Sequence, residues 1–278
     1  MRIDLHTHST VSDGTDSPAA LVELAAAAGL DVVGLTDHDS TLGWDEAAAS
    51  AQRMGIALVR GVELSARMAG RSVHILSYLH DRSDPGLNAE SAQVRDSRVT
   101  RAERMVQRLA ADYPIDWQAV VAQTAPGTTI GRPHIADALV AAGVSPNRSA
   151  AFASLLAPGG PYYVRHYATP AAQMVRLIRN AGGVPVLAHP GAKSRGNPVD
   201  DDDIVHMCEA GLAGLEVRHR DNPPEERARL ERLAERLNLL VTGSSDYHGT
   251  GKPNRLGENL TDAPTLNAIL AQGAAPLV

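Results

Sequence analysis

Seven short apolar segments recur along this 278-residue chain, and helical patterns separate most of them. The first segment, residues 3–5, leads into two histidines, and several later segments end next to further histidines. These strand-end histidines are His6, His8, His38, His189 and His248. Alternating strand and helix patterns are typical of a parallel sheet joined by right-handed crossovers. They predict an α/β fold, a distorted seven-stranded (β/α)7 TIM-like barrel whose functional site lies at the carboxyl ends of its strands.

The alternation stops between residues 81 and 167. Helical patterns at residues 95–109, 116–123, 134–142 and 149–156 follow one another there, separated by proline and glycine. We therefore expect a discontinuous barrel of residues 1–80 and 168–278, interrupted by a helical insertion (cap domain) of residues 81–167. With 44% hydrophobic residues the chain can bury a sizeable core, which must be aliphatic because only 3% of residues are aromatic.

Charge and cysteine content narrow the classes of function. The formal net charge of −6 argues against a protein that coats nucleic acid by general electrostatic attraction. The single cysteine, Cys208, has no internal disulfide partner, which fits a reducing compartment. No apolar segment approaches the roughly 20 residues that a membrane span needs, so we expect a cytoplasmic protein with no membrane partner. The sequence indicates no oligomeric state.

Carboxylates accompany the histidines near the predicted strand ends. Asp13 follows the first histidine pair, Glu63 follows the third apolar segment, and Asp246 precedes the last histidine by two residues. The fourth segment carries a further histidine, His74. So many imidazoles around one unfilled pocket would repel one another when protonated, whereas mixed nitrogen and carboxylate ligands can hold several divalent ions. A shared metal centre is therefore a better interpretation than a set of unrelated packing histidines.

A family resemblance rests on five motifs of the barrel segments. In chain order they are His6-x-His8, Thr36-Asp37-His38, Glu63, His74 and Ser245-Asp246-x-His248. In this order the motifs resemble those of the polymerase-and-histidinol-phosphatase (PHP) family of metallophosphoesterases, and the resemblance covers about residues 1–80 and 168–260. The insertion contains Gly131-Arg132-Pro133-His134. It is similar to one branch of the family, the 3′,5′-nucleoside bisphosphate phosphatases, which are related to short-RNA 5′-exonucleases.

The resemblance implies three divalent ions, with Mn²⁺ as the expected metal and Fe²⁺ or Zn²⁺ as alternatives. By this resemblance the first ion is held by His6, His8, Glu63 and Asp246, the second by Glu63, His74 and His134, and the third by Asp13, His38 and His248. Several branches of the family have a histidine where Asp13 stands. The harder oxygen ligand at this position favours Mn²⁺ or Fe²⁺ over Zn²⁺.

The reaction that the resemblance implies is hydrolysis of a phosphomonoester of a nucleotide. In the branch named above this is the 3′-phosphate of a nucleoside 3′,5′-bisphosphate, for example adenosine 3′,5′-bisphosphate giving AMP and phosphate. Short 5′-phosphorylated oligoribonucleotides are a further substrate class. Divalent ions activate a water molecule and neutralise phosphate oxygens. The leaving ribose oxygen is basic and needs a proton, and we expect His189, at a strand end but outside the nine ligands, to be the general acid.

The candidates for holding phosphate are basic or hydroxyl side chains near these motifs. Arg132 lies beside His134, and the loop after the fifth strand-end histidine contains Lys193, Ser194 and Arg195. In the insertion, Arg101 and Arg104 belong to a row of arginines that borders the apolar face of a helix, from which they could reach over the pocket. A solvated surface is the alternative interpretation for the loop and for the row.

Three other functions remain as alternatives. A metal-dependent amidohydrolase also opens with His-x-His on a barrel strand, but many such enzymes use a carboxylated lysine in mid-barrel. Neither Lys193 nor Lys252 lies at an early strand end, which disfavours that class. The second alternative is a histidinol-phosphate phosphatase, and the third is a PHP module that serves only as a scaffold. Phosphate release from bisphosphonucleotides, compared with histidinol phosphate and with amide or lactone substrates, separates these functions.

Overall fold

The computed structural model describes residues 1–193 and 198–278 of the chain. Within these residues one sheet runs in the order β1 (Ile3–Thr7), β2 (Val32–Leu35), β3 (Ala57–Met68), β4 (Arg71–Tyr78), β6 (Val184–Leu187), β7 (Gly214–Arg218) and β8 (Leu240–Gly243), with the short β5 (Thr169–Pro170) paired to β3. A bridge between Thr7 and Tyr247 brings the two edges of the sheet together. The sheet is a nearly closed seven-stranded barrel with one open seam, which confirms the predicted α/β fold class.

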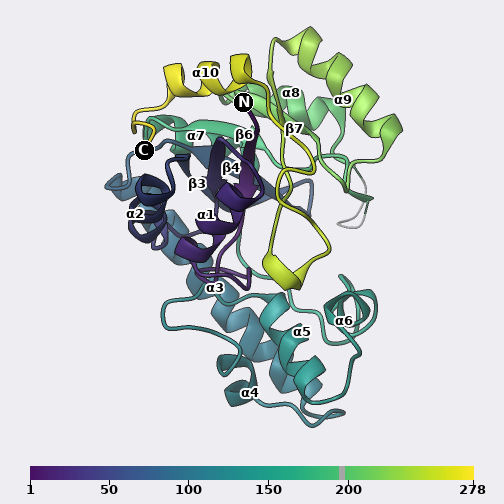
Figure 1. Cartoon of the computed structure of the whole chain (residues 1–278). Coiled ribbons are helices and arrows are strands. Elements are labelled where there is room, and N and C mark those ends of the chain that lie inside the picture. The colour runs from purple at the N-terminus through teal and green to yellow at the C-terminus, as the bar shows by residue number, and fades with distance from the viewer. Residues whose placement is uncertain (194–197) are drawn as a thin grey trace.

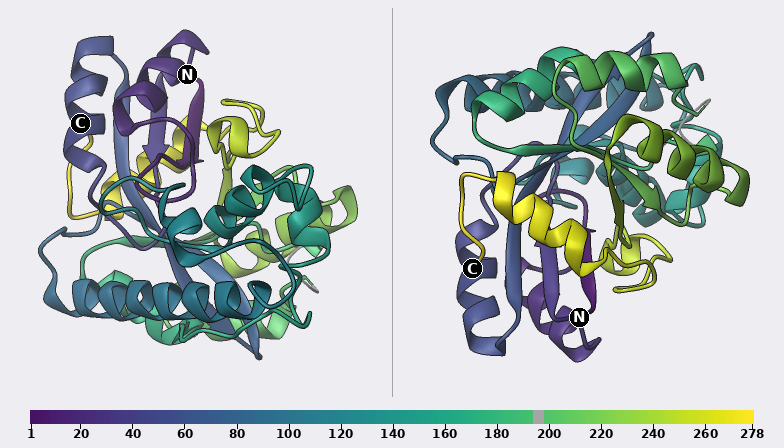
Figure 2. Two further views of the ribbon diagram at one scale, coloured as in Figure 1. Left: turned by 90° about the horizontal axis from the view of Figure 1, so that it is seen from below. Right: turned by 90° about the horizontal axis from the view of Figure 1, so that it is seen from above.

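Six helices of the described residues accompany the barrel strands. They are α1 (Pro18–Ala27), α2 (Trp44–Met54), α7 (Ala171–Asn180), α8 (Asp201–Glu209), α9 (Pro224–Leu237) and α10 (Ala263–Gln272). Local sequence sets their ends: Ser17 caps α1 by accepting a hydrogen bond from Ala20 N–H, and α2 ends at Gly55, whose φ is 69°. Figures 1 and 2 show α10 across the end of the barrel at which β1 begins, so the carboxyl end of β1 points away from this helix.

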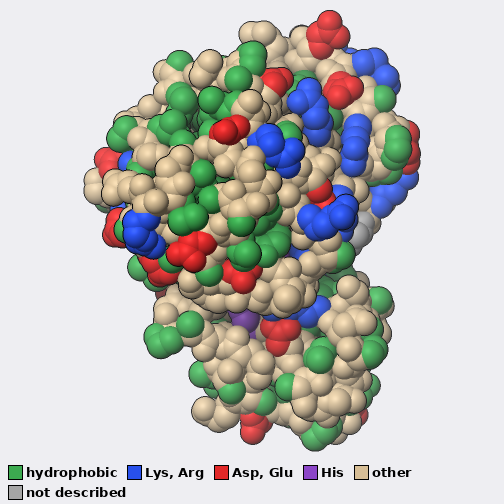
Figure 3. All heavy atoms as spheres, in the orientation of Figure 1, with side chains coloured by type: hydrophobic (Ala, Val, Ile, Leu, Met, Phe, Trp, Pro, Cys, Tyr) green, Lys and Arg blue, Asp and Glu red, His purple; other side chains and the backbone are tan. Residues whose placement is uncertain are grey.

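The remaining helices lie at the other end of the barrel, below the strands in Figure 1. They are α3 (Pro85–Leu109), α4 (Trp117–Val121), α5 (Arg132–Ala141) and α6 (Arg148–Ala153). Their apolar side chains form a separate core cluster in which Met105, Leu109, Ile135 and Leu139 are fully buried. Figure 3 shows this part as a distinct lobe, with a histidine visible where it meets the barrel. We retain residues 81–167 as the proposed insertion domain.

One strand runs against the predicted direction. β4 is antiparallel to both of its neighbours, β3 and β6, so the expectation of seven parallel strands is wrong at this position. Only Ala69 and Gly70, both with positive φ, separate β3 from β4. A link this short forms a hairpin, whereas parallel strands need a long crossover. Ser65 pairs with His74 in the hairpin, and Glu63 lies on the same face two residues earlier, which makes Glu63 a diagonal neighbour of His74.

The structure contains no candidate membrane span among the described residues. None of its helices there combines the length and the apolar composition that crossing a bilayer requires. Buried apolar side chains instead form two clusters around the barrel strands, one of which includes Ile3, Leu5 and Val186. These clusters fix the strands whose carboxyl ends carry the candidate site.

Candidate metal centre

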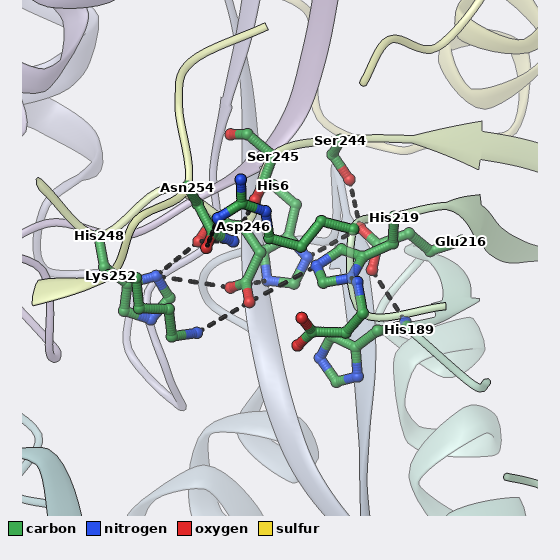
Figure 4. Close-up of polar contacts among 12 residues, drawn as sticks. His6, His189, Glu216, His219, Ser244, Ser245, Asp246, His248, Lys252 and Asn254 are labelled. Carbon is green, nitrogen blue, oxygen red and sulfur yellow. Dashed lines mark hydrogen bonds and ion pairs between the residues drawn. The ribbon is translucent and has the colours of Figure 1, made fainter. Parts of the chain in front are cut away.

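Buried imidazoles and carboxylates from distant parts of the chain meet at the mouth of the barrel, beside the insertion. β1 and the loop that follows it supply His6, His8 and Asp13, the loop after β2 supplies His38, and the β3–β4 hairpin supplies Glu63 and His74. The segments after β6 and β8 supply His189, Asp246 and His248. His6 and His8 are completely buried, and Glu63 and Asp246 are each 1% exposed. Figure 4 shows the part of this cluster around Asp246.

A first group of four donor atoms comes from His6, His8, Glu63 and Asp246. His6 Nε2 lies 3.3 Å from Glu63 Oε2 and 3.4 Å from Asp246 Oδ1. His8 Nε2 lies 3.1 Å from the same Glu63 oxygen and 3.4 Å from the same Asp246 oxygen. Donors this close to one another can all bind one ion. The structure therefore brings together the four residues predicted to hold the first ion.

A second group of donor atoms lies on the other side of the Glu63 carboxylate, around Oε1. His74 Nδ1 is 2.6 Å from Glu63 Oε1, and His189 Nε2 is 3.0 Å from the same oxygen. His38 Nδ1 lies 3.2 Å from Glu63 Oε2, so the carboxylate has imidazoles on both sides. This arrangement suits a carboxylate that bridges two ions.

A third group of donor atoms lies around the Asp13 carboxylate. His248 Nε2 is 3.2 Å from Asp13 Oδ1, and His8 Nδ1 is 3.6 Å from that oxygen. His38 Nε2 is 3.8 Å from the other oxygen, Asp13 Oδ2. These distances place Asp13 between imidazoles of three separate chain segments, and the donor atoms of His8, Asp13 and His38 lie close enough to share an ion.

Among the described residues, His134 belongs to none of the groups of side chains that lie close enough to share an ion. His134 occupies the third position of α5, where its Nδ1 accepts a hydrogen bond of 3.0 Å from Gly131 N–H. Its Nε2 then carries the hydrogen and donates to the Ser12 carbonyl at 3.0 Å. Both ring nitrogens are engaged by the backbone, so neither offers a lone pair to an ion.

His189 takes the place that sequence reasoning gave to His134. Its ring lies against Glu63 beside His74, as described above, and its backbone has the unusual φ of 33°. Its backbone N–H donates to Glu216 Oε2 at 2.8 Å, which holds this conformation. We therefore propose His189 as a ligand with His74 and withdraw it as the general acid. The strand-end position of His189 was the signal for either role.

Three further residues that contact the cluster escaped the sequence analysis, of which Glu216 and His219 are buried and Lys252 is half-buried at the cavity. Glu216, on β7, is fully buried, and its Oε1 accepts a hydrogen bond of 2.9 Å from His6 Nδ1. Lys252 Nζ lies 2.8 Å from Asp246 Oδ2, and His219 Nε2 lies 3.6 Å from the same oxygen (Figure 4). These contacts orient the inner ligands. Glu216 and His219 follow the same strand-end pattern as the predicted ligands, and that pattern could have revealed them.

In this cluster the imidazoles change the pKa of the carboxyl groups, and the carboxylates change the pKa of the imidazoles. Burial disfavours the charged form of Glu63, but His74 and His38 hold the pKa of its carboxyl well below the usual range. Burial lowers the pKa of His8, but Asp246 and Glu63 raise it to about 9. The buried carboxylates therefore need positive charge around them, which divalent cations supply when the imidazoles release their protons.

Buried polar atoms without a hydrogen bond provide a test of whether the residues fit metal ions. Among the described residues, no hydrogen-bond partner is found for Asp13 Oδ1, His38 Nδ1, Glu63 Oε2 or His248 Nε2. His38 Nδ1 faces Glu63 Oε2 and His248 Nε2 faces Asp13 Oδ1, each at 3.2 Å, and coordination to a cation satisfies all four atoms. Mixed imidazole and carboxylate donors suit Mn²⁺, Fe²⁺ or Zn²⁺. The residues therefore fit a divalent metal centre.

A cavity of about 650 Å³ opens above the cluster and separates it from the insertion. On the barrel side it is lined by Asp13, His38, His74, His189 and His248, and on the insertion side by Arg98, Arg101, Arg132, Arg148, Phe152 and Tyr163. The Arg132 guanidinium carbon lies 5.1 Å from the Phe152 ring centre and 5.8 Å from that of Tyr163. Cations held against aromatic faces, next to a metal-type cluster, make this cavity suited to a phosphorylated ligand with an aromatic part.

The structure places the six predicted phosphate-binding residues in different surroundings. Arg101 and Arg132 line the cavity. Arg104 is exposed because its position on α3 turns it away from the buried face, and it is not among the lining residues. Lys193 is also exposed and forms an ion pair of 2.9 Å with Glu225. The other two candidates, Ser194 and Arg195, lie outside the described residues.

Comparisons with known proteins agree with this geometry. The family model of the PHP domain matches residues 4–114. A 3′,5′-nucleoside bisphosphate phosphatase from Chromobacterium violaceum is 34% identical, over 95% of this chain and 93% of its own length. The chain belongs to the PHP family.

Two further proteins are similar to this PHP chain over most of its length. A phosphoribosyl 1,2-cyclic phosphate 1,2-diphosphodiesterase from Eggerthella lenta is 34% identical, over 88% of this chain and 94% of its own length. The crystal structure of a proposed metal-dependent phosphoesterase from Bifidobacterium adolescentis has a TM-score of 0.96 and 46% sequence identity, covering 98% of this chain and 96% of that one. This PHP protein is a metal-dependent phosphoesterase with a buried cluster suited to binding metal.

Proposed function

We propose that this PHP phosphoesterase hydrolyses the 3′-phosphate of nucleoside 3′,5′-bisphosphates, for example adenosine 3′,5′-bisphosphate to AMP and phosphate. The observation that carries the proposal is the two-sided cavity, in which metal-type ligands face buried arginines. A substrate with two phosphate groups can place one against cations and the other against guanidinium groups. The similarity to the Chromobacterium violaceum phosphatase supports this substrate class.

The barrel side of the cavity holds the phosphate that is removed. We propose three divalent ions there, with Mn²⁺ as the expected metal and Fe²⁺ or Zn²⁺ as alternatives. Their proposed ligands are His6, His8, Asp13, His38, Glu63, His74, His189, Asp246 and His248. Bound ions activate water and neutralise the phosphate oxygens. The chain contributes by holding each ligand in a fixed orientation, as Glu216 does for His6.

The insertion side holds the second phosphate. Arg101 Nε donates to the Val164 carbonyl at 3.0 Å, and Arg132 Nη1 donates to the Leu156 carbonyl at 3.2 Å. These hydrogen bonds hold both guanidinium groups in place. Arg101 Nη2 is buried and has no hydrogen-bond partner among the described residues, which leaves a donor for a phosphate oxygen. Tyr163, beside both arginines, offers a flat apolar surface for a base.

A second candidate function uses the same reacting group. The similarity to the Eggerthella lenta diesterase favours a ribose cyclic phosphate as the substrate, since that protein cleaves a phosphate ester of a ribose. Short 5′-phosphorylated oligoribonucleotides are a third candidate substrate class, which the similarity to a 5′-3′ exoribonuclease from Haemophilus influenzae supports. Each of these substrates places a phosphate ester of a ribose next to the cluster.

A phosphate-release screen in Mn²⁺ tests the proposal. The substrates are adenosine 3′,5′-bisphosphate, 3′-AMP, a ribose 1,2-cyclic phosphate, a 5′-phosphorylated dinucleotide and histidinol phosphate, with a lactone as the control for amidohydrolase chemistry. We expect the bisphosphate to give AMP and to exceed 3′-AMP in kcat/KM by about tenfold or more, because only the bisphosphate pairs a second phosphate with the arginines. Equal rates with 3′-AMP, or a preference for another substrate, would contradict the proposal.

A further inference from the structure

Four consecutive carbonyl groups in the loop after β1 accept hydrogen bonds from the insertion. Thr128 Oγ1 donates to Thr10 O at 2.8 Å, Thr129 N to Val11 O at 2.9 Å, His134 Nε2 to Ser12 O at 3.0 Å, and Arg148 Nη1 to Asp13 O at 3.0 Å. The donors belong to the segment before α5, the first turn of α5 and the start of α6. One short loop of the barrel is thus held by three parts of the insertion.

The same loop is held from its other side by the barrel. Asp37, after β2, accepts hydrogen bonds from Ser9 N–H at 2.8 Å and from Ser12 Oγ at 2.7 Å. Ser12 Oγ also lies 3.2 Å from His8 Nδ1. The loop therefore lies between the barrel and the insertion, and its last residue is Asp13, a proposed metal ligand.

The donors of the insertion are themselves fixed. Gly131 N–H donates to His134 Nδ1, which sets the His134 ring so that Nε2 points at the loop. Arg148 Nη2 forms an ion pair of 2.6 Å with Asp137 of α5, and this pair ties the start of α6 to α5. Gly251 packs so closely against Arg148 that a Cβ at position 251 would lie 2.2 Å from Nη1. The hydrogen bonds to the loop thus come from a rigid frame.

We propose that the insertion contributes directly to the metal centre. His134 and Arg148 are positioning residues that hold the loop of residues 10–13. Binding of the ion at Asp13 depends on these two residues. Asp13 has to stay between His38 and His248 to bind that ion, and its carbonyl is held by Arg148. The other proposed ions are bound without Asp13 and do not share this dependence. The inference rests on the proposed metal centre and not on any substrate.

Mn²⁺ binding to the metal-free full-length protein tests the inference, with free Mn²⁺ followed by electron paramagnetic resonance. His134→Phe removes both ring contacts. His134→Gln keeps an amide oxygen for Gly131 N–H and an amide N–H for Ser12 O. We expect His134→Phe to weaken one class of Mn²⁺ site by about 10- to 100-fold and to leave the others within about twofold. His134→Gln should bind within about threefold of the wild type.

Further variants identify the weakened site. Arg148→Gln should weaken the same class of site, whereas Arg104→Gln, an exposed arginine of the same lobe, should leave all sites unchanged. In an Asp13→Asn background, which already lacks this ligand, His134→Phe should produce little further change. Thermal unfolding of each variant checks that the lobe stays folded.

Two results would overturn the inference. One is wild-type Mn²⁺ affinity at every site in both His134→Phe and Arg148→Gln. The other is an equal loss at all sites, because that would make the insertion a general support of the fold. These measurements use no substrate, so they stand apart from the phosphate-release screen. A failed screen with the expected Mn²⁺ pattern would reject the bisphosphate substrate and leave this inference in place.

Discussion

The two sides of the cavity place opposite charges around their histidines. On the barrel side the neighbours are carboxylates: Asp246 and Glu63 raise the pKa of His8 to about 9, although burial lowers the pKa of His248 to about 4. On the insertion side, burial and the neighbouring arginines, Arg98 and Arg101 foremost, lower the pKa of His166 to about 2. Carboxylates therefore surround the barrel side and guanidinium groups the insertion side. The proposed substrate, held by metal ions on one side and by arginines on the other, requires such a difference in charge.

The two sides also differ in how they are constructed. Ligands of the barrel side come from strands and strand ends, whose positions are set by backbone pairing in the sheet. Two arginines of the insertion side, Arg101 and Arg132, are instead held by carbonyl groups of the segment that leads back to the barrel, Val164 and Leu156. Because the barrel side carries the proposed metal ligands, changes there should have the larger effect on activity.

The largest effect is expected from Glu63→Gln. The Glu63 carboxylate contacts His6, His8, His38, His74 and His189, and the amide removes the negative charge on which two proposed ions depend. We expect kcat/KM with Mn²⁺ to fall by about a thousandfold or more, since loss of the ions removes several kcal/mol of transition-state stabilisation. Metal content per chain, measured by plasma mass spectrometry, should fall in parallel. Full metal content with full activity would refute the role of Glu63.

A smaller effect on the same side is expected from Glu216→Gln. Glu216 accepts hydrogen bonds from His6 Nδ1 and from His189 N–H, so it orients two proposed ligands without reaching the cavity. We expect Mn²⁺ affinity to fall by about 10- to 100-fold and activity to recover at high Mn²⁺ concentration. Activity that stays low at saturating Mn²⁺ would assign Glu216 a different role.

The residues on the barrel side of the cavity were largely predictable from the sequence. Strand ends in a barrel converge at one mouth, whatever the structure of the chain between them. His6, His8, Glu63 and Asp246 meet for this reason. The direction of β4 was not foreseen, since the two-residue link between β3 and β4 was not recognised as a hairpin. The consequence for the site was small, because Glu63 and His74 still meet across the hairpin.

The insertion side was much less predictable. Helical periodicity shows which residues share a face but not which face meets the barrel, and so Arg101 and Arg104 could not be told apart. The hydrogen-bond partners of His134 were missed for a similar reason. Its position at the start of a helix fits a capping role as well as a ligand role, and only the packing of α5 against the Ser12 carbonyl decides between them. Contacts between segments far apart in the chain leave no local pattern to detect.

On the insertion side, Arg101→Met should affect one substrate class selectively. Its buried Nη2 is proposed to bind the second phosphate. We expect kcat/KM for adenosine 3′,5′-bisphosphate to fall by about tenfold, mostly through KM, while 3′-AMP hydrolysis changes little. Arg104→Met, on the exposed face of α3, is the matched control and should behave as the wild type. Equal losses for both substrates would remove Arg101 from recognition of the second phosphate.

The smallest effect concerns acid stability and tests the lowered pKa of His166 directly. With its pKa lowered to about 2, His166 stays neutral in the folded chain while the unfolded chain binds a proton below about pH 6.5. The unfolded state therefore binds more protons, and His166 costs stability as the pH falls. Between pH 7 and 5.5 this loss amounts to about 1 kcal/mol.

His166→Asn should remove this part of the acid sensitivity. Urea unfolding of the wild type and the variant at both pH values measures the difference, and the variant should lose about 1 kcal/mol less between them. Phe152→Leu, on the same side of the cavity but without a titrating group, should keep the pH dependence of the wild type. An unchanged pH dependence in His166→Asn would mean that this histidine takes up a proton in the folded chain, and the electrostatic contrast between the two sides would then be weaker than the structure indicates.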